Sequence, residues 1–238
     1  MHSLTVIVPA AGVGRRLGLG RNKAFVEIGG LPLLVLCLRM LARTGLVRKA
    51  VVVTGAAEQE ETRALLERYR QTCYPELELA LTAGGKERQD SVANGLALIQ
   101  DTEGYVAVHD GARPFAGKAV FARTLAMAEQ YGAAIAAVPV KDTIKVAGPD
   151  GFITATPVRA TLRAAQTPQI FEINLLRRAY AHLAEQAQNG HPVAVTDDAS
   201  LVEALGHPVA LAEGSQENIK VTTPEDLLLA EEIVKELE

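Results

Sequence analysis

A loop of small and cationic side chains near the N-terminus is the strongest candidate for chemistry in this sequence. It contains Gly12 and Gly14, continues through Arg16 and leads to Lys23. Small residues let backbone N–H groups approach a polyphosphate, and the cations supply positive charge. The loop follows an apolar run, Leu4 to Val8, and α/β folds bind ligands at the carboxyl ends of their strands. These features predict a nucleoside triphosphate site.

Two common phosphate-binding motifs fit this loop poorly. The P-loop motif requires four residues between its glycines and then Gly-Lys-Ser/Thr, which the loop lacks. The dinucleotide motif requires a third small residue after Gly12 and Gly14, where the chain has Arg15, Arg16 and Leu17. Bulky cations there favour a more highly charged ligand than a dinucleotide and argue against a dinucleotide oxidoreductase. An ordinary strand-to-helix turn with solvated arginines remains the alternative.

A second polar turn follows the third of the apolar runs in the chain. It extends from Gly85 and Lys86 to Ser91, which leads into a helical pattern. Backbone groups of such a turn can pair with the edge of a nucleobase, and the Ser91 hydroxyl can donate or accept a hydrogen bond. A structural role is the alternative, because Asp90 or Ser91 could serve as the N-cap of that helix.

Asp110 follows the fourth apolar run and begins the segment Asp110-Gly111-Ala112-Arg113. A carboxylate opposite a triphosphate loop is well placed to hold Mg²⁺, which prefers one or two carboxylates plus phosphate oxygens. Arg113 could bind a second phosphate with its guanidinium fork. Asp110 could instead be a turn residue, since Asp-Gly is a common turn pair. We expect a structural role for the neighbouring His109.

Polar residues in the last third of the chain are harder to assign. Asp197 and Asp198 begin a helical pattern, where acidic side chains complement the helix dipole. We favour that structural role for Asp198 and leave Asp197 open. Lys220 lies just before the last helix and adds one more cation. No assignment follows from the residues alone for Arg159, Arg163, Gln166, Thr167 and Gln169.

Strand and helix patterns alternate along the chain. Short apolar runs, several rich in valine, are typical of buried parallel strands. The segments between them carry apolar residues at three- and four-residue spacing, as crossover helices do. The last helix has a defined start, with Thr223 as N-cap and Pro224 at its first position. We predict a three-layer, mostly parallel α/β sheet with strands at 4–8, 50–54, 77–82, 105–109 and 134–138 and helices at 33–42, 58–69, 91–99 and 120–131.

One segment, 139–160, interrupts the alternation. Thr143 to Val146 and Phe152 to Thr154 flank Pro149-Asp150-Gly151, a pattern typical of a β-hairpin. An isolated hairpin is only marginally stable in water, so it needs a surface to pack on. We predict a single domain, 1–238, whose arm at 139–160 is embraced by a second subunit in a two-fold homodimer.

Composition narrows the functional classes. A chain of 238 residues with 48% hydrophobic content can bury one substantial core. The formal net charge of -4 argues against a nucleic-acid partner, which would need a basic stripe. Cys37 and Cys73 match no metal-binding spacing. The sequence shows no signal peptide and no apolar run of membrane-spanning length, so we expect a cytoplasmic protein without a membrane partner.

Six ordered blocks of residues together resemble the 2-C-methyl-D-erythritol 4-phosphate cytidylyltransferase family of the non-mevalonate isoprenoid pathway. The resemblance covers nearly the whole chain. The blocks are Pro-Ala-Ala-Gly-x-Gly-Arg-Arg from Pro9, Gly85-Lys86-Glu87-Arg88-x-Asp90-Ser91-Val92, His109-Asp110-x-Ala112-Arg113-Pro114, Asp142-Thr143-Ile144-Lys145, Gln166-Thr167-Pro168-Gln169 and Asn218-Ile219-Lys220-Val221-Thr222.

The resemblance implies a Rossmann-like nucleotidyltransferase fold and the transfer of CMP from CTP to methylerythritol phosphate, with Mg²⁺ as cofactor. It implies that CTP is bound by Pro9, Ala10, Ala11, Gly12, Gly14, Gly85, Lys86, Ser91, Asp110, Gly111 and Ala112, with Asp110 holding Mg²⁺. It implies catalytic roles for Arg16, Lys23, Arg159 and Lys220. It implies binding of the sugar phosphate by Arg113, Thr143, Arg159, Thr167 and Lys220, with Thr143 and Arg159 coming from the neighbouring subunit's arm.

The sequence departs from the family pattern near the first loop. The family usually has Pro-Lys-Gln where this chain has Asn22-Lys23-Ala24. This difference keeps the lysine and its charge but puts the rigidity of the loop in doubt. Gly111 replaces a more usual alanine. The sequence leaves two alternatives. One is a pentitol-phosphate enzyme such as a ribitol 5-phosphate cytidylyltransferase, although those enzymes tend to begin with Leu-Ala-Gly-Gly. The other is a nucleotide-binding regulator without turnover.

Overall fold

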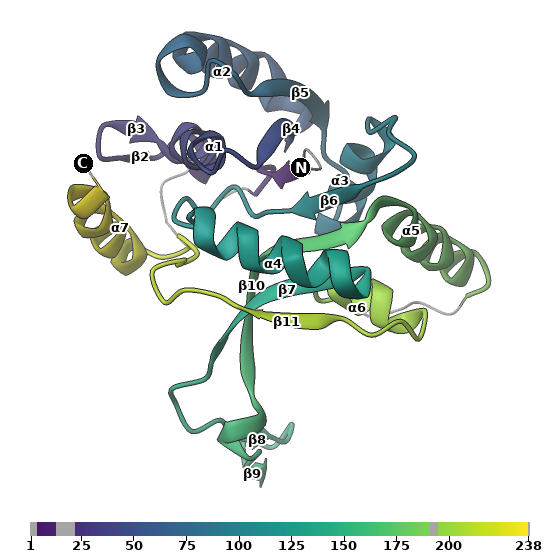
Figure 1. Ribbon diagram of the computed structural model, residues 1–238. Helices are drawn as coiled ribbons and strands as arrows, with labels where there is room; N and C mark the ends of the chain where they lie inside the picture. Colours follow the sequence, from purple (N-terminus) through teal and green to yellow (C-terminus); the bar gives the residue numbers. More distant parts are fainter. Residues whose placement is uncertain (1–3, 13–21, 191–194, 238) are drawn as a thin grey trace.

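The computed structural model describes residues 4–12, 22–190 and 195–237. A seven-stranded sheet runs through them in the order β11-β7-β10-β6-β1-β4-β5 (Figure 1). The strands are β1 (Leu4–Pro9), β4 (Val47–Thr54), β5 (Glu78–Ala83), β6 (Tyr105–Val108), β7 (Ala133–Pro139), β10 (Arg163–Glu172) and β11 (Ala210–Glu213). They pair in parallel except β10, which is antiparallel to both neighbours.

Helices cover both faces of the sheet, so the predicted three-layer arrangement is confirmed. The helices are α1 (Leu33–Arg43), α2 (Gln59–Cys73), α3 (Arg88–Ala97), α4 (Lys118–Tyr131), α5 (Ile173–Gln188), α6 (Asp198–Ala204) and α7 (Pro224–Leu237). Alternate residues of β1 show the two faces. Val6 and Val8 pack with α1, α2 and α4, whereas Ile7 packs with α3, α5 and α6. Burial on both faces explains the near-continuous apolar runs of the parallel strands.

Most predicted elements are confirmed with ends shifted by a few residues, but the strands β10 and β11, the short pair β2 (Glu27–Ile28) and β3 (Leu31–Pro32), and the helix α5 were not predicted. The last helix begins as expected. The Thr223 hydroxyl accepts from the Asp226 N–H at 3.4 Å, and the Asp226 carboxylate accepts from the Thr223 N–H at 2.8 Å. This reciprocal pair satisfies two N–H groups that a helix start leaves without intrahelical partners. The helix α7 packs beside the small antiparallel pair β2 and β3 (Figure 1).

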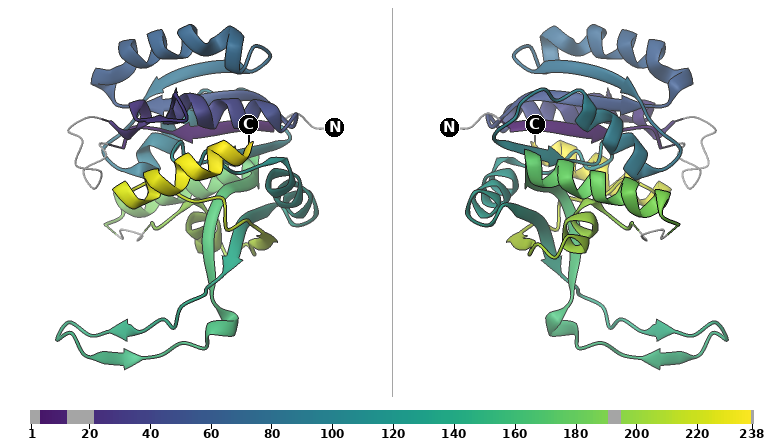
Figure 2. Two further views of the ribbon diagram at one scale, coloured as in Figure 1. Left: turned by 90° about the vertical axis from the view of Figure 1, so that its left-hand side faces the viewer. Right: turned by 90° about the vertical axis from the view of Figure 1, so that its right-hand side faces the viewer.

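The predicted hairpin is confirmed as an arm that extends away from the body (Figure 2). Its strands, β8 (Val146–Ala147) and β9 (Ile153–Ala155), are antiparallel. The strand β8 is shorter than expected, and β9 is shifted by one residue. The Gly151 N–H donates to the Gly148 carbonyl at 3.0 Å, and Gly151 has a φ of +80°, a conformation that favours glycine. A short 3-10 helix, η4 (Arg159–Thr161), leads the chain back into β10. Within the described residues, no helix is both long and apolar enough to cross a bilayer.

Candidate active site

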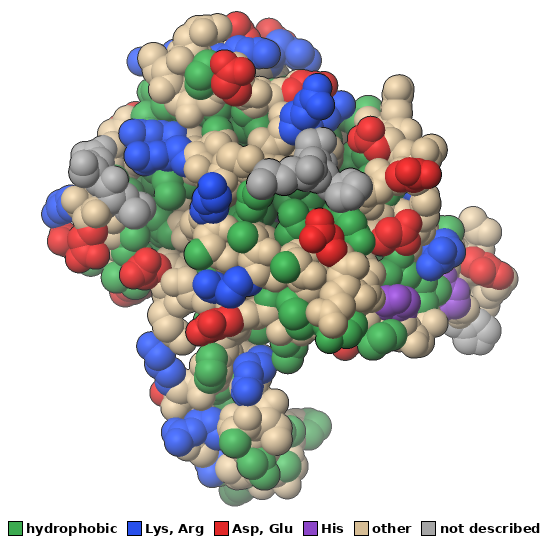
Figure 3. Space-filling view, viewed as in Figure 1, with side chains coloured by type: hydrophobic (Ala, Val, Ile, Leu, Met, Phe, Trp, Pro, Cys, Tyr) green, Lys and Arg blue, Asp and Glu red, His purple; other side chains and the backbone are tan. Residues whose placement is uncertain are grey.

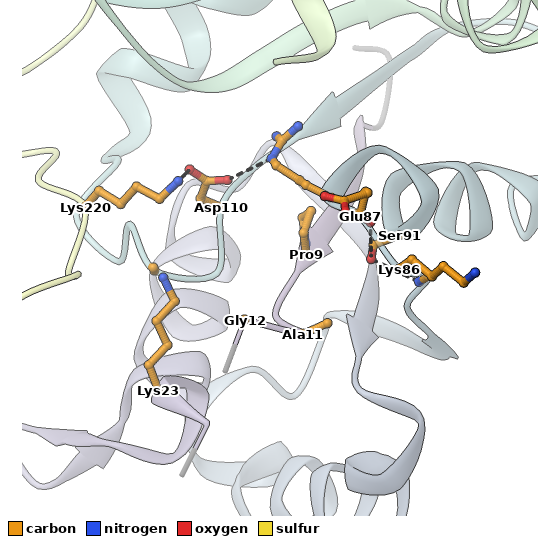
Figure 4. Close-up of a pocket in the computed structure, with 12 residues that line it drawn as sticks. Pro9, Ala11, Gly12, Lys23, Lys86, Glu87, Ser91, Asp110 and Lys220 are labelled. Atoms are coloured by element: carbon orange, nitrogen blue, oxygen red, sulfur yellow. Dashed lines mark hydrogen bonds and ion pairs between the residues drawn. The ribbon is translucent and has the colours of Figure 1, made fainter. Parts of the chain in front are cut away.

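A pocket of about 330 Å³ lies at the carboxyl ends of β1, β5 and β6 (Figure 4). Parallel strands end at the same edge of the sheet, and their following turns meet there. Ten of the residues that line the pocket were predicted to do chemistry. They are Pro9, Ala11, Gly12, Lys23, Gly85, Lys86, Ser91, Asp110, Ala112 and Lys220. The fold therefore brings these ten predicted residues together from five separate segments.

Two described residues of the predicted CTP site, Ala10 and Gly111, do not line this pocket. Gly14 and Arg16 lie outside the described residues. Ala10 is buried beneath the pocket wall at 6% exposure. Gly111 packs closely against the end of β1, where an added Cβ would lie 3.3 Å from the Pro9 carbonyl oxygen. Ala10 and Gly111 thus support the wall from behind.

The turn after β5 is fixed by Ser91. Its hydroxyl accepts from the Gly85 N–H and donates to the Glu87 carbonyl, each at 3.2 Å. The alternative that Asp90 or Ser91 caps the helix is wrong, because α3 begins at Arg88 with Glu87 as N-cap. Asp90 lies at the third helical position, and its carboxylate accepts from the Glu87 N–H at 3.0 Å. A Cβ at Gly85 would collide with Asp90, so this turn requires glycine.

Three cations surround the Asp110 carboxylate at the pocket floor. Lys220 Nζ lies 2.8 Å from it, Arg113 Nε 3.6 Å and Arg88 Nε 3.7 Å. Figure 4 shows the carboxylate pointing toward Lys220. Burial alone would raise the pKa of Asp110, but Lys220 and Arg88 outweigh it and hold that pKa well below its usual range. Asp110 is therefore ionised, and positive charge gathers around it.

The backbone at Asp110 is held in place by a buried threonine and histidine. Thr167 Oγ1 accepts from the Asp110 N–H and lies 3.1 Å from His109 Nδ1. His109 Nε2 lies 2.9 Å from the Arg113 carbonyl, which can only accept. The neutral ring therefore carries its proton on Nε2 and accepts from Thr167 at Nδ1. Burial lowers the pKa of His109 to about 4, and the ring is 1% exposed, so its role is structural as expected.

His109 should make the stability of the protein fall as the pH decreases from 6.5 to about 4. Over that range the unfolded chain binds a proton at His109 that the folded chain does not, so the free energy of unfolding should drop by about 3 kcal/mol. Urea unfolding of wild type and His109→Gln at several pH values isolates this contribution from those of Asp110 and Asp198. Equal pH dependence of the two proteins would contradict it.

A second pocket, of about 300 Å³, adjoins the first. Arg88, Asp110 and Lys220 line both pockets. Arg113 and Thr167, predicted to bind the sugar phosphate, line the second pocket together with Gln166, Gln169, Thr196 and Asp197. Two adjoining cavities that share two cations and a carboxylate could hold two phosphate-bearing molecules side by side.

Buried hydrogen bonds fix the segment that carries Lys220. Asn218 is fully buried, its side-chain N–H donates to the Thr167 carbonyl at 2.8 Å, and its own carbonyl accepts from Arg113 Nη1 at 2.7 Å. The Val221 N–H donates to the Ala112 carbonyl at 2.8 Å. Lys220 is thus held between two anchored neighbours and directed at Asp110.

Arg88 was not predicted as a site residue, yet it connects the two pockets to α6. Its Nη1 lies 2.7 Å from the carboxylate of Asp198, which is 1% exposed and also accepts from the Tyr180 hydroxyl at 2.6 Å. Asp198 thus forms a buried ion pair at the helix start. Asp197, left open above, is the N-cap of α6 and accepts from Gln169 Nε2 at 2.7 Å. Sequence patterns carry no signal for an ion pair between residues so far apart.

The predicted arm residues lie apart from the pockets of their own chain. Thr143 and Arg159 are exposed and line neither pocket. Arg159 Nη1 donates to the Lys141 carbonyl at 3.1 Å. Figure 3 shows lysine and arginine side chains along the arm and its base. Thr143 and Arg159 therefore contribute to neither pocket of their own chain.

Comparison with known proteins identifies the relatives of this chain. The family model for 2-C-methyl-D-erythritol 4-phosphate cytidylyltransferase matches residues 4–236. Proteins with that name from Bacillus mycoides and Syntrophotalea carbinolica are 45% and 46% identical over 227 and 233 residues, which is 95% and 96% of this chain and 96% and 95% of theirs.

Solved structures give the same result. The cytidylyltransferase of that name from Thermus thermophilus is 33% identical, with a TM-score of 0.77 over 98% of this chain and 99% of that one. The 4-diphosphocytidyl-2C-methyl-D-erythritol synthase of Anaerococcus prevotii is 28% identical, with a TM-score of 0.81 over the same shares of the two chains. The predicted fold class, a Rossmann-like nucleotidyltransferase sheet with a protruding arm, is confirmed by these neighbours.

Proposed function

Because the chain belongs to the 2-C-methyl-D-erythritol 4-phosphate cytidylyltransferase family, we propose that its two adjoining pockets place the two substrates of that reaction for direct in-line attack. The enzyme transfers CMP from CTP to methylerythritol phosphate and forms the CDP-linked methylerythritol and pyrophosphate. In our proposal an acceptor phosphate oxygen attacks the α-phosphorus of CTP, the bond to the β-phosphate breaks, and no covalent enzyme intermediate forms.

The shared wall of the two pockets carries this proposal. Arg88, Asp110 and Lys220 line both cavities, so a triphosphate in the first pocket and a phosphate monoester in the second meet at the same charged groups. In-line transfer requires the attacking and leaving oxygens on opposite sides of the reacting phosphorus. Two cavities that share one charged wall would allow that arrangement.

The acceptor needs no general base. A phosphate monoester has its second pKa near 6, so it is largely a dianion at neutral pH. His109, which lies behind the shared wall, is neutral and occupied by Arg113 and Thr167, as this chemistry allows. The main barrier is electrostatic, since a dianion must approach a triphosphate. Positive charge that is fixed before the substrates arrive lowers this barrier.

The roles proposed for single residues follow from position and charge. The first pocket is called the CTP pocket below. Lys23 and Lys220 both line it, and they would stabilise the charge that develops around the α-phosphate. Arg113 lines the second pocket, where it would hold the acceptor phosphate. Gly85 and Ser91 lie at the far side of the CTP pocket and would meet the cytosine and ribose. Arg16 would assist Lys23, as the family resemblance implies.

Mg²⁺ fits this site as a partner of the substrate. Asp110 is ionised and faces the pocket, and no group of three or more potential metal-binding side chains occurs among the described residues. A metal site here would therefore depend on phosphate oxygens as well as Asp110, which is how Mg²⁺ is usually held. Asp110 would hold the ion, whose positive charge would neutralise part of the negative charge of the phosphates. Lys220 and Arg88 keep Asp110 in its charged form.

We propose that the arm completes the site of a second subunit. Five large hydrophobic residues of the arm are exposed, with Phe152 at 73%, Val158 at 69% and Ile153 at 63%. Such a cluster on a two-stranded hairpin is unstable without a partner surface. In a two-fold homodimer each arm would bury this cluster and bring Thr143 and Arg159 to the partner's acceptor phosphate.

We propose a cytoplasmic location for the protein. Both cysteines are free thiols, which supports this proposal.

The stereochemistry at the α-phosphorus tests direct attack. The enzyme is supplied with CTP that carries sulfur on the α-phosphate in one defined configuration, and the product configuration is determined by phosphorus NMR. One in-line displacement inverts the configuration. Retention would show two displacements and would mean that a covalent enzyme intermediate exists, against the proposal.

A further inference from the structure

Asn22 lies at the point where the first loop rejoins the body, and all of its side-chain hydrogen-bonding groups are used. Its side-chain N–H groups donate to the Ala10 carbonyl at 3.0 Å and to Glu58 Oε2 at 2.6 Å. Its side-chain oxygen accepts from the Ala24 N–H at 3.0 Å and caps the 3-10 helix η2 (Lys23–Phe25). Asn22 is 3% exposed, so these bonds are protected from water.

The three partners of Asn22 belong to three different segments of the pocket region. Ala10 lies in the segment from Pro9 to Gly12, which lines the pocket and is called the N-terminal limb below. The Ala10 N–H donates to the Val53 carbonyl in β4 at 2.7 Å. Glu58 ends the 3-10 helix η3 (Ala56–Glu58) that follows β4. One amide therefore ties both ends of the first loop to each other and to the central sheet.

Lys23 follows Asn22 directly, and its side chain lies beside the N-terminal limb at Gly12. A Cβ placed on Gly12 would be 3.5 Å from Lys23 Cε, so the lysine stem passes over the face of Gly12 on which a side chain would stand. The φ of Asn22 is −61°, the value that a proline ring would impose. The chain thus keeps the backbone direction that a proline would give at this position, and it adds side-chain hydrogen bonds to three partners. The two bonds that the Asn22 amide donates, to Ala10 and Glu58, are called the amide clasp below.

We propose that Asn22 is a positioning residue for catalysis, whose amide clasp on Ala10 and Glu58 holds Lys23 against the N-terminal limb of the CTP pocket. The inference rests on the proposed catalytic role of Lys23. A lysine stem has many rotamers, and fixing the backbone on both sides of the loop limits where the ammonium group can lie. Displacement of a charged group by about 1 Å can cost up to about 10²-fold in rate.

Asn22→Asp removes the two hydrogen bonds of the amide clasp and leaves the size and shape of the side chain almost unchanged. A carboxylate can still accept from the Ala24 N–H, so the cap of η2 survives. It cannot donate to the Ala10 carbonyl, and it repels Glu58. We expect kcat to fall about 10-fold with the KM for methylerythritol phosphate unchanged within about twofold, because the acceptor pocket is not altered.

A swapped pair and a second background separate positioning from general stability. In the double variant Asn22→Asp with Glu58→Gln the donor and the acceptor change places. The new glutamine amide can then donate to the new carboxylate, and kcat should recover at least about threefold. In the Lys23→Ala background, Asn22→Asp should cost less than about twofold, since the residue through which it acts is gone. Asn174→Asp makes the same substitution at an exposed residue that does not line the pocket, where it removes an amide bond to the Thr102 carbonyl, and is the control for the chemical change itself.

Steady-state kinetics and thermal unfolding of these variants test the positioning role of Asn22. The proposal is overturned if Asn22→Asp leaves kcat unchanged, if the swapped pair recovers nothing, or if the losses from Asn22→Asp and Lys23→Ala multiply. Should Asn22→Asp fail to fold, Glu58→Ala removes only one acceptor and should lower kcat about threefold. An inactive wild-type protein would instead count against the proposed function itself.

Discussion

Replacing Lys23 with alanine should lower kcat by about 10²-fold or more and leave the fold intact. Lys23 lines the CTP pocket, and its ammonium group is proposed to stabilise charge that develops only as the α-phosphate is attacked. Removing an interaction made only in the transition state lowers kcat and kcat/KM together. The short helix η2 that carries Lys23 is capped by the Asn22 side chain, so thermal unfolding should change little.

Steady-state kinetics with both substrates and a matched control test this expectation. Lys235→Ala removes a lysine of α7 that pairs with the exposed Glu232, and it should behave as wild type. A loss confined to the KM for CTP would assign Lys23 to ground-state binding. An unchanged kcat would remove Lys23 from the catalytic groups.

Mixing Arg159→Ala with Lys220→Ala, each nearly inactive alone, should restore about a quarter of wild-type activity. Arg159 lies on the arm and lines neither pocket of its own chain, whereas Lys220 lines both. If the arm serves the partner's site, a mixed dimer has one site with both residues intact and one site with neither. Random exchange makes half of the dimers mixed, and half of their sites are active.

Subunit exchange is followed by labelling one variant, and activity is measured after exchange is complete. A mixture of Lys23→Ala and Lys220→Ala provides the control, because both residues line the pocket of one chain and no mixed dimer contains an intact site. Recovery in the control would show that activity returns for another reason. No recovery in the Arg159 mixture, despite proven exchange, would reject the shared site.

The parallel part of the fold could be predicted because its signal is local. Burial on both faces makes β1 and β4 nearly continuous apolar runs, and the crossover helices show their periodicity in single segments. The hairpin turn was equally visible, because Gly151 and its neighbours have the chemistry that a tight turn needs.

The strand β10 could not be predicted because its polar residues are satisfied from far away in the chain. Gln166, Thr167 and Gln169 are buried at 7%, 4% and 2% exposure, a pattern unlike a core strand. Their partners include Asn218, His109 and Asp197, which lie 28 to 58 positions away. Burial of such side chains is stable only when each bond is formed, so the sequence of β10 alone indicates no strand.

The pocket residues from turns after strands could be predicted, but the charge network could not. The rule that parallel strands end at one edge groups Gly12, Ser91 and Asp110 without knowledge of the structure. Arg88 was overlooked because the preference of Asp and Ser for N-caps suggested a later helix start, whereas Glu87 takes that position. Its partner Asp198 is brought near only by the packing of α6.

Pyrophosphate release measured with CTP, Mg²⁺ and methylerythritol 4-phosphate, beside ribitol 5-phosphate as acceptor and ATP or GTP as nucleotide, tests the central claim most directly. We expect turnover that requires both CTP and methylerythritol phosphate. Turnover that prefers ribitol phosphate, or no turnover by a well-folded protein with both substrates present, would contradict it.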